Sequence, residues 1–201
     1  MSIKGKSITD CLAFFISALL SPYITALVFI IIITYKYSNN LGEFLPWMIT
    51  FLLFGTVIPG IYVLWLIEIK KIQDIHIADQ NDRKMPFWIA GISAVVGTII
   101  LFYLHAATPV IVMAVTYSAN ALLVALITQY WKISIHMALF ASIATVAVIL
   151  FGPIYSLLYI ILIPLAWSRI FRKRHTLLQA VAGALLAFAL TTGVFWLFGY
   201  L

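Results

Sequence analysis

The sequence predicts an all-α fold, a polytopic bundle of transmembrane helices with about six to seven spans. Hydrophobic residues make up 65% of the chain and charged residues only 9%, whereas an ordinary soluble domain has roughly a quarter charged residues. The apolar residues also occur in long runs that do not alternate with polar ones, and a helix needs about 20 such residues to cross a bilayer. Helices are expected because lipid offers the backbone no hydrogen-bond partner. We therefore expect residues 1–201 to form a single integral membrane domain.

Hydropathy places seven apolar segments along the chain, at residues 12–35, 46–68, 86–104, 109–131, 136–151, 154–169 and 177–200. The first segment follows two lysines, as the apolar part of a secretory signal does. It continues to Ile33, however, without a small-residue cleavage pattern. We therefore expect the first segment to be retained as a membrane span.

Proline and glycine mark the expected irregularities of these helices. The fifth and sixth segments are short and meet at Gly152-Pro153, which predicts a tight, helix-breaking turn. Pro22, Pro59 and Pro164 lie inside other segments. Each of these prolines is expected to kink its helix without ending it.

The basic residues are distributed unevenly across the predicted membrane. Loops that follow the second, fourth and sixth spans lie on the same side as the N-terminus, and the opposite side has only Lys36. The positive-inside rule makes the basic side cytoplasmic in a multi-pass protein of the plasma (inner) membrane, although residues gathered around an anionic substrate produce the same pattern. The basic side carries Lys4, Lys6, Lys70, Lys71, Arg83, Lys84, Lys132, Arg169, Arg172, Lys173 and Arg174.

The three loops on this side predict an anion site. Each loop leads into the N-terminal end of the next span, where free backbone N–H groups and the helix dipole favour a bound anion. Two loops also carry a histidine, His136 and His175. One imidazole can act as a nucleophile in phosphoryl transfer while the other donates a proton to the leaving group. If these span ends converge, they form a phosphate-sized pocket lined by Arg83, Lys84, Lys132, Arg169 and either Arg172 or Arg174.

Three short motifs follow one another in these loops. They read Arg83-Lys84-Met85-Pro86, Ser134-Ile135-His136, and Ser168-Arg169 followed by five residues and His175. In this order they resemble the signatures K-x6-R-P, P-S-G-H and S-R-x5-H of the type 2 phosphatidic acid phosphatase superfamily, which are membrane-bound lipid phosphate phosphatases. The third motif is the closest match, the second has isoleucine in place of proline and glycine, and the first is only approximate. The resemblance covers roughly residues 68–195.

The resemblance implies a role for each matched residue. His175 is the implied nucleophile, which takes the phosphoryl group as a phosphohistidine, and His136 protonates the departing lipid oxygen. The reaction needs no metal and no other cofactor. The implied phosphate-binding residues are Arg169, Arg83, Ser134 and Ser168, with Lys84 or Lys132 in place of the missing lysine of the first signature.

One position departs from the family pattern. The family has an aspartate four residues after the nucleophilic histidine, and here that residue is Gln179. A glutamine carbonyl can accept the imidazole N–H, but it cannot stabilise an imidazolium as a carboxylate does. In the serine protease triad, changing the aspartate to asparagine lowers turnover by about 10⁴. We therefore expect activity that is slow, absent, or supported by another carboxylate such as Asp79 or Asp82.

Three functions remain open at this stage. The first is a metal-independent phosphatase acting on a lipid phosphate or a polyprenyl diphosphate. The second is a non-catalytic protein that binds or transports lipid phosphates, and the third, less favoured, is a prenyltransferase that holds magnesium between Asp79 and Asp82. A basic loop that only anchors the chain to anionic headgroups is the simplest alternative for the charges. Nucleic acid is not an expected partner despite the net charge of +6, because the basic residues lie at span ends.

Overall fold

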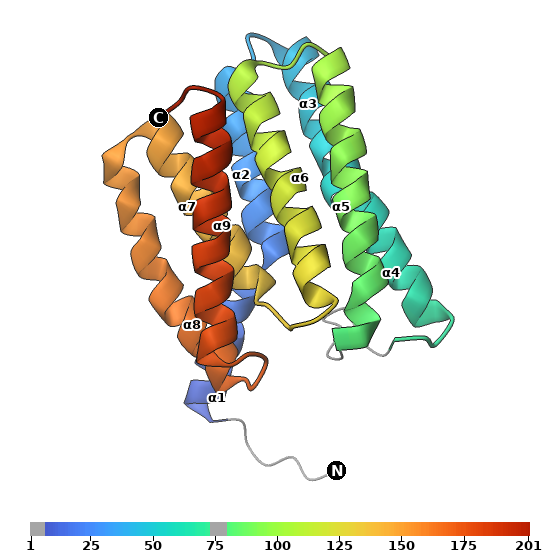
Figure 1. Ribbon diagram of the computed structural model, residues 1–201, viewed down its shortest axis with the longest axis vertical. Helices are drawn as coiled ribbons and strands as arrows, with labels where there is room; N and C mark the ends of the chain where they lie inside the picture. The colour runs from blue at the N-terminus through green and yellow to red at the C-terminus, as the bar shows by residue number, and fades with distance from the viewer. Residues whose placement is uncertain (1–6, 73–79) are drawn as a thin grey trace.

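The computed structural model describes residues 7–72 and 80–201. Within these ranges the secondary structure is entirely helical, which confirms the predicted all-α fold class (Figure 1). In chain order the elements are α1 (Ile8–Leu19), α2 (Pro22–Tyr37), α3 (Leu41–Leu52), the π-helix η1 (Leu53–Val57), α4 (Ile58–Glu68), α5 (Gln80–Tyr103), α6 (Thr108–Thr128), α7 (Ile135–Phe151), the 3₁₀-helix η2 (Pro153–Ile161), α8 (Leu162–Phe171) and α9 (Leu177–Leu197).

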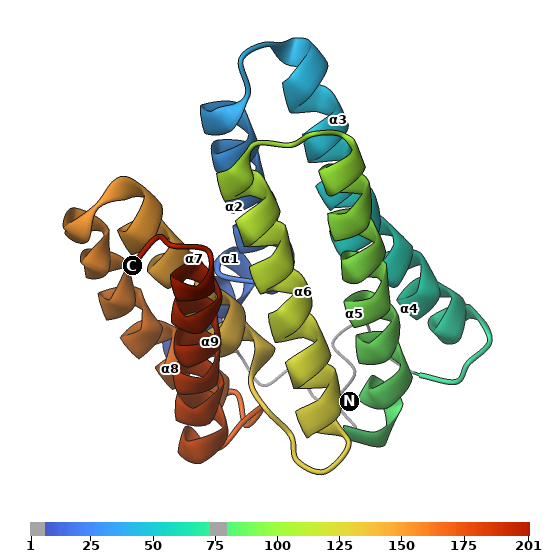
Figure 2. The same cartoon turned by 45° about the horizontal axis from the view of Figure 1, so that its top comes forward.

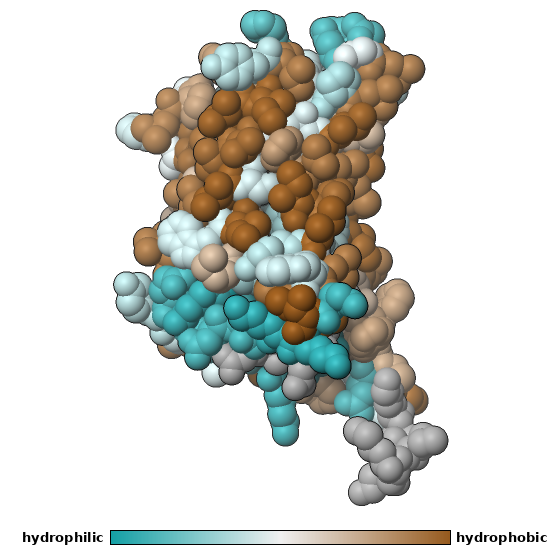
Figure 3. Space-filling view, turned by 90° about the vertical axis from the view of Figure 1, so that its right-hand side faces the viewer, coloured by the Kyte–Doolittle hydropathy of each residue, from teal (hydrophilic) through white to brown (hydrophobic). Residues whose placement is uncertain are grey.

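Six helical segments of the described chain are long and apolar enough to cross a membrane. They cover Ile8–Tyr37, Leu41–Glu68, Gln80–Tyr103, Thr108–Thr128, Pro153–Phe171 and Leu177–Leu197, and α7 is a shorter apolar helix of 17 residues. Figure 3 shows the corresponding surface, a broad hydrophobic region that ends in a hydrophilic band. The chain is thus a multi-pass integral membrane protein, with the six to seven spans that hydropathy predicts.

The first span is divided, which differs from the simple kink expected at Pro22. Helix α1 ends at Leu19, and Pro22 takes the first position of α2. Ser21 caps the new helix, because its hydroxyl accepts a hydrogen bond from the N–H of Ile24 at 3.4 Å. The predicted turn between the fifth and sixth segments is confirmed, since Gly152 has a φ of 109°, a conformation that other residues rarely adopt.

Pro59 follows the π-helix η1 and leaves a backbone carbonyl of η1 without its usual partner. A proline has no N–H, so the carbonyl of Gly55, four residues earlier, loses its usual helical partner. The hydroxyl of Tyr117 donates to this carbonyl at 3.0 Å, and the hydroxyl of Ser93 donates to the neighbouring carbonyl of Phe54 at 2.7 Å. The irregular backbone of η1 is therefore stabilised by side chains from α5 and α6, which fixes these three segments to one another.

Helices α4, α6 and α8 end at the same end of the bundle, which is also the end where α1 lies, as the parity of the spans predicts (Figure 1). Helix α5 packs along α6 and helix α7 along α9, and both views show α8 on the outer side of this second pair (Figure 2). Thr191 of α9 joins three helices, since its hydroxyl bonds to Ser142 of α7 at 2.8 Å and to Asn120 of α6 at 3.3 Å. The bundle therefore brings the starts of α5, α7 and α9 to the same end.

Candidate functional site

A cavity of about 260 Å³ lies within the bundle, between α2, η1, α4, α5, α6 and α7. Most of its wall is apolar, and its deep part is lined by members of the hydrophobic core such as Phe29, Phe51, Met113 and Val146. The wall changes character at the end where the basic loops lie. The charged and imidazole side chains that line it there are Arg83, His136, Arg169 and His175.

The turn between α8 and α9 fixes Arg169 and His175 relative to each other. Helix α8 ends in a Schellman motif, in which the N–H of Arg174 donates to the carbonyl of Arg169 and the N–H of Lys173 to that of Ile170. Lys173 has a φ of 53°, the left-handed conformation that this motif requires. The N–H of His175 also donates to the carbonyl of Arg169, at 3.4 Å. The five-residue spacing between Arg169 and His175 is therefore the length of this turn.

Helix α9 begins immediately after His175 with a capping box. The hydroxyl of Thr176 accepts from the N–H of Gln179 at 3.3 Å, and Oε1 of Gln179 accepts from the N–H of Thr176 at 3.2 Å. The position at which the phosphatases that the third motif resembles have aspartate is thus occupied here by a capping residue. Gln179 does not line the cavity.

The second motif is held against the start of α9. The N–H of Ser134 donates to the carbonyl of Gln179 at 3.3 Å. Gly183, one turn further along α9, allows this contact, because a Cβ atom at that position would lie 2.8 Å from the carbonyl oxygen of Ser134. The resulting close packing of α9 on the start of α7 places His136, in the first turn of α7, in the same cavity as His175.

Arg83 reaches the cavity from the start of α5. The side chain of Gln80 donates to the carbonyl of Thr128 at 3.0 Å, which joins the first turn of α5 to the last turn of α6. Arg83 is 6% exposed and Arg169 is 4% exposed. Burial of two guanidinium groups at one end of a cavity is unfavourable unless an anion or polar groups accept from them.

Some buried polar atoms near this end have no hydrogen-bond partner among the described residues. Examples are Oγ of Ser134, Nε of Arg169 and Nδ1 of His175. Unsatisfied buried polar atoms are rare in native proteins, and a group of them commonly marks a site for a ligand or for water. The resemblance of the three motifs implies phosphate binding or catalysis for all three residues. Arg169 and His175 line the cavity and Ser134 lies beside it without lining it, and an anion in the cavity can accept from the Nε–H of Arg169.

The surroundings of His175 keep its imidazole neutral. Burial and the positive charges of Arg169, Arg83 and Lys132 lower the pKa of His175 from 6.5 to about 3. A side-chain hydrogen bond with Gln179 acts in the opposite direction and does not offset these effects. At neutral pH the ring therefore has an unprotonated nitrogen, which is the form that can act as a nucleophile.

This lowered pKa predicts that acid destabilises the protein. Between pH 6.5 and about 3 the unfolded chain binds a proton on His175 that the folded chain does not bind, so the free energy of unfolding falls as the pH falls through this range. We expect Tm in phosphate-free detergent buffer to decrease from pH 7 to pH 4, and to decrease less in the variant His175→Asn. Equal decreases in both proteins would contradict a depressed pKa.

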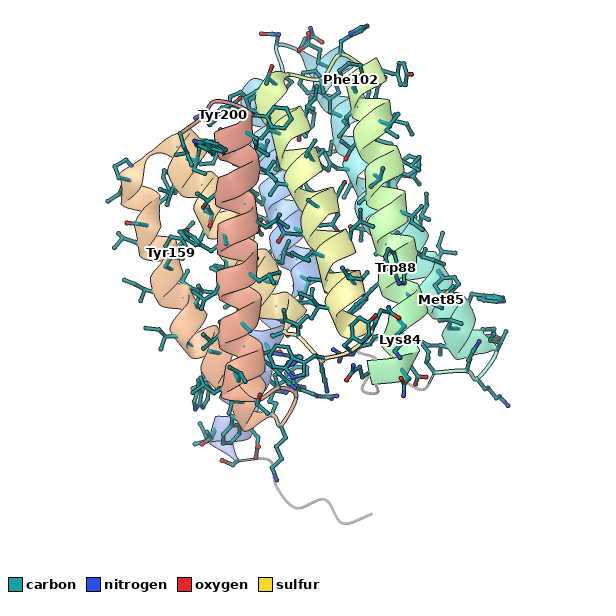
Figure 4. The ribbon with its side chains drawn as sticks, in the orientation of Figure 1. Lys84, Met85, Trp88, Phe102, Tyr159 and Tyr200 are labelled. Carbon is teal, nitrogen blue, oxygen red and sulfur yellow. The ribbon has the colours of Figure 1, made fainter. Side chains whose placement is uncertain are left out.

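The other predicted site residues have different positions. Lys132 is partly buried and near enough to affect His175, but it does not line the cavity, and neither do Arg172 and Arg174. Ser168 is fully buried, and its hydroxyl donates to the carbonyl of Leu165 within its own helix at 2.8 Å. Lys84 also lies outside the cavity wall, on the lower part of α5 with Met85 and Trp88 (Figure 4). The structure therefore brings together Arg83, His136, Arg169 and His175 as a group.

Of the two acidic residues proposed for magnesium, Asp82 alone lies among the described residues. Asp82 is exposed in the first turn of α5, and Asp79 lies outside the described residues. Among residues 7–72 and 80–201, no group of three or more His, Cys, Asp or Glu side chains is arranged to hold a metal ion.

The chain was compared with protein-family models, curated proteins and solved structures. None of them matches.

Proposed function

We propose that this protein is a lipid phosphate phosphohydrolase of the plasma (inner) membrane, a divergent relative of the type 2 phosphatidic acid phosphatases. The observation that supports the proposal best is the composition of the cavity wall. Two buried arginines and two histidines line one end, and apolar side chains line the remainder. A phosphate monoester or diphosphate with a hydrocarbon tail matches both parts of this wall, because the guanidinium groups complement the phosphate and the apolar wall complements the tail.

The proposed reaction has two steps. A ring nitrogen of His175 attacks the phosphorus, the bond between phosphorus and the lipid oxygen breaks, and protonated His136 gives its proton to that oxygen. Water then attacks the phosphohistidine while His136 takes a proton back, so that free phosphate is released and both histidines return to their initial state. Arg83 and Arg169 stabilise the charge on the phosphoryl oxygens throughout.

The first test is phosphate release by the detergent-purified protein. Phosphatidate, phosphatidylglycerophosphate and a polyprenyl diphosphate are supplied in turn, each with and without EDTA. We expect turnover of at least one lipid that is unaffected by EDTA and far faster than turnover of glycerol phosphate, which has no tail. Loss of turnover in EDTA would favour the magnesium-dependent alternative, and equal turnover of glycerol phosphate would contradict a role for the apolar wall.

A non-catalytic lipid phosphate binder is the second candidate, and the capping role of Gln179 is the observation that favours it. The variant Gln179→Glu keeps a capping box, since glutamate serves at this position as well as glutamine, and it adds a carboxylate beside His175. Gln179→Asp places the carboxylate of aspartate where the phosphatase family has it, on a side chain that is one methylene shorter than that of glutamine. If the protein is an enzyme that lacks this carboxylate, at least one variant is expected to raise kcat. If both bind lipid phosphate but neither releases phosphate, the protein is a binder.

A further inference from the structure

Helix α1 contacts the candidate site through one side chain that no motif predicts. Nη1 of Arg169 donates a hydrogen bond to Oγ of Ser17 at 2.6 Å, and these residues are 152 positions apart in the chain. Ser17 is 3% exposed and Arg169 is 4% exposed. A hydrogen bond from a charged donor contributes more when it is shielded from water, so this contact is expected to restrict the guanidinium strongly.

The covalent geometry of the guanidinium decides what remains available to a ligand. In arginine, Nε–H and one N–H of Nη2 point in the same direction and form the edge that binds an oxyanion with two parallel hydrogen bonds. Nη1 lies on the other side of the group, and this is the nitrogen that Ser17 holds. Nε of Arg169 is buried without a hydrogen-bond partner among the described residues. The contact with Ser17 thus leaves the Nε–Nη2 edge for an anion in the cavity that Arg169 lines.

A second contact shows that α1 and α8 are aligned in register. The guanidinium of Arg172 lies 5.1 Å from the ring centroid of Phe14. Phe14 and Ser17 are three residues apart and share one face of α1, and Arg172, the C-cap residue of α8, follows Arg169 by three residues. Phe14 is 58% exposed and Arg172 does not line the cavity, so this outer contact lies outside the site.

We propose that Ser17 is a positioning residue for phosphate binding, which acts by fixing the guanidinium of Arg169 so that its Nε–Nη2 edge meets the anion. The proposal rests on the proposed function in one respect, that Arg169 binds phosphate. The proposal gives α1, which lies outside all three motifs, a role in orienting a phosphate-binding side chain.

The test compares two variants of equal shape. Ser17→Thr retains the hydroxyl and Ser17→Val does not, while both add the same bulk to a buried position. Affinity for inorganic phosphate is measured in detergent with full-length protein, and KM and kcat are measured where a lipid phosphate is turned over. We expect Ser17→Val to bind phosphate at least about tenfold more weakly than Ser17→Thr, which corresponds to one lost hydrogen bond to a charged group, and to show the loss mainly in KM. Ser17→Ala is expected to resemble Ser17→Val.

Two controls separate positioning from general packing. Ser118→Ala removes a hydroxyl that is equally buried and bonds to Thr98 at 2.8 Å away from the cavity wall, and Phe14→Leu weakens the outer contact of α1. Both are expected to bind phosphate as the wild type does. In a background of Arg169→Ala, exchanging Thr for Val at position 17 is expected to have no further effect, because the two residues act through one interaction.

The outcomes distinguish the two proposals. If the wild type binds phosphate no better than Arg169→Ala does, the proposed function fails at its first premise. If Arg169→Ala loses affinity but Ser17→Thr and Ser17→Val bind equally, the anion site stands and the role of Ser17 is refuted. A Thr–Val difference that persists in the Arg169→Ala background would also refute it, since Ser17 would then act by another route.

Discussion

Replacing His175 by asparagine is expected to reduce phosphate release by at least about 10³-fold, because loss of a nucleophile removes the covalent route entirely. His175 is 7% exposed and lines the polar end of the cavity with its pKa lowered to about 3. Its imidazole is therefore neutral at neutral pH, with one ring nitrogen free of a proton. No other histidine of the predicted site occupies the same turn. The measurement is kcat with the best substrate from the lipid panel.

His105→Asn is the matched control for this substitution. His105 is exposed and lies at the opposite end of the bundle, between α5 and α6, and its φ of 51° suits asparagine. The control is expected to retain wild-type activity and stability. Turnover by His175→Asn within tenfold of the wild type would refute the assigned nucleophile, whether or not the variant still binds phosphate.

Replacing Gly183 by alanine is expected to have the second-largest effect, although the change adds only one methyl group. The added Cβ would lie 2.8 Å from the carbonyl oxygen of Ser134, so the backbone at the start of α7 must shift away from α9. Overpacking of this kind costs about 1–3 kcal/mol of stability. A displacement of about 1 Å between reacting groups can also cost about 10²-fold in rate, and the shift moves His136 relative to His175.

Gly193→Ala provides a control on the same helix. A Cβ atom there would meet no atom within 4 Å, and alanine favours a helix by up to about 1 kcal/mol relative to glycine. We expect Gly193→Ala to leave activity unchanged and Tm unchanged or higher, while Gly183→Ala lowers both. Equal behaviour of the two variants in thermal unfolding and in phosphate release would show that the contact between α7 and α9 does not control the site.

The helices and the polar end of the bundle were predictable because both depend on local sequence. Apolar runs of sufficient length must become helices in lipid, and the parity of the spans then fixes which loops share a side. The S-R-x5-H spacing was equally informative, since its residues belong to one turn. The division of the first span was not anticipated, because a proline in the first turn of a helix and a proline inside a helix look alike until the preceding capping residue is recognised.

The hydrogen bond between Ser17 and Arg169 could not be predicted, because nothing in a single sequence marks a contact between residues 152 positions apart. The exclusion of Lys84 from the cavity wall depends on which face of α5 it occupies, which its position beside Arg83 in the chain does not reveal. Gln179 also has a local function that a family comparison obscures. Its side chain completes a capping box, a role that any helix beginning with Thr-x-x-Gln can adopt.

The carbonyl of Arg169 accepts hydrogen bonds from the N–H groups of both Arg174 and His175, and it therefore joins two residues of the site through the backbone. The backbone that carries Arg169 and His175 is one short hydrogen-bonded loop, so the separation of these two backbone positions depends on local bonds, while the contact with Ser17 of α1 holds the guanidinium group itself. The distance between the backbones of Arg169 and His175 therefore does not depend on how the helices of the bundle pack. The distances from either residue to Arg83 and His136, in contrast, depend on the tertiary packing of α5 and α7.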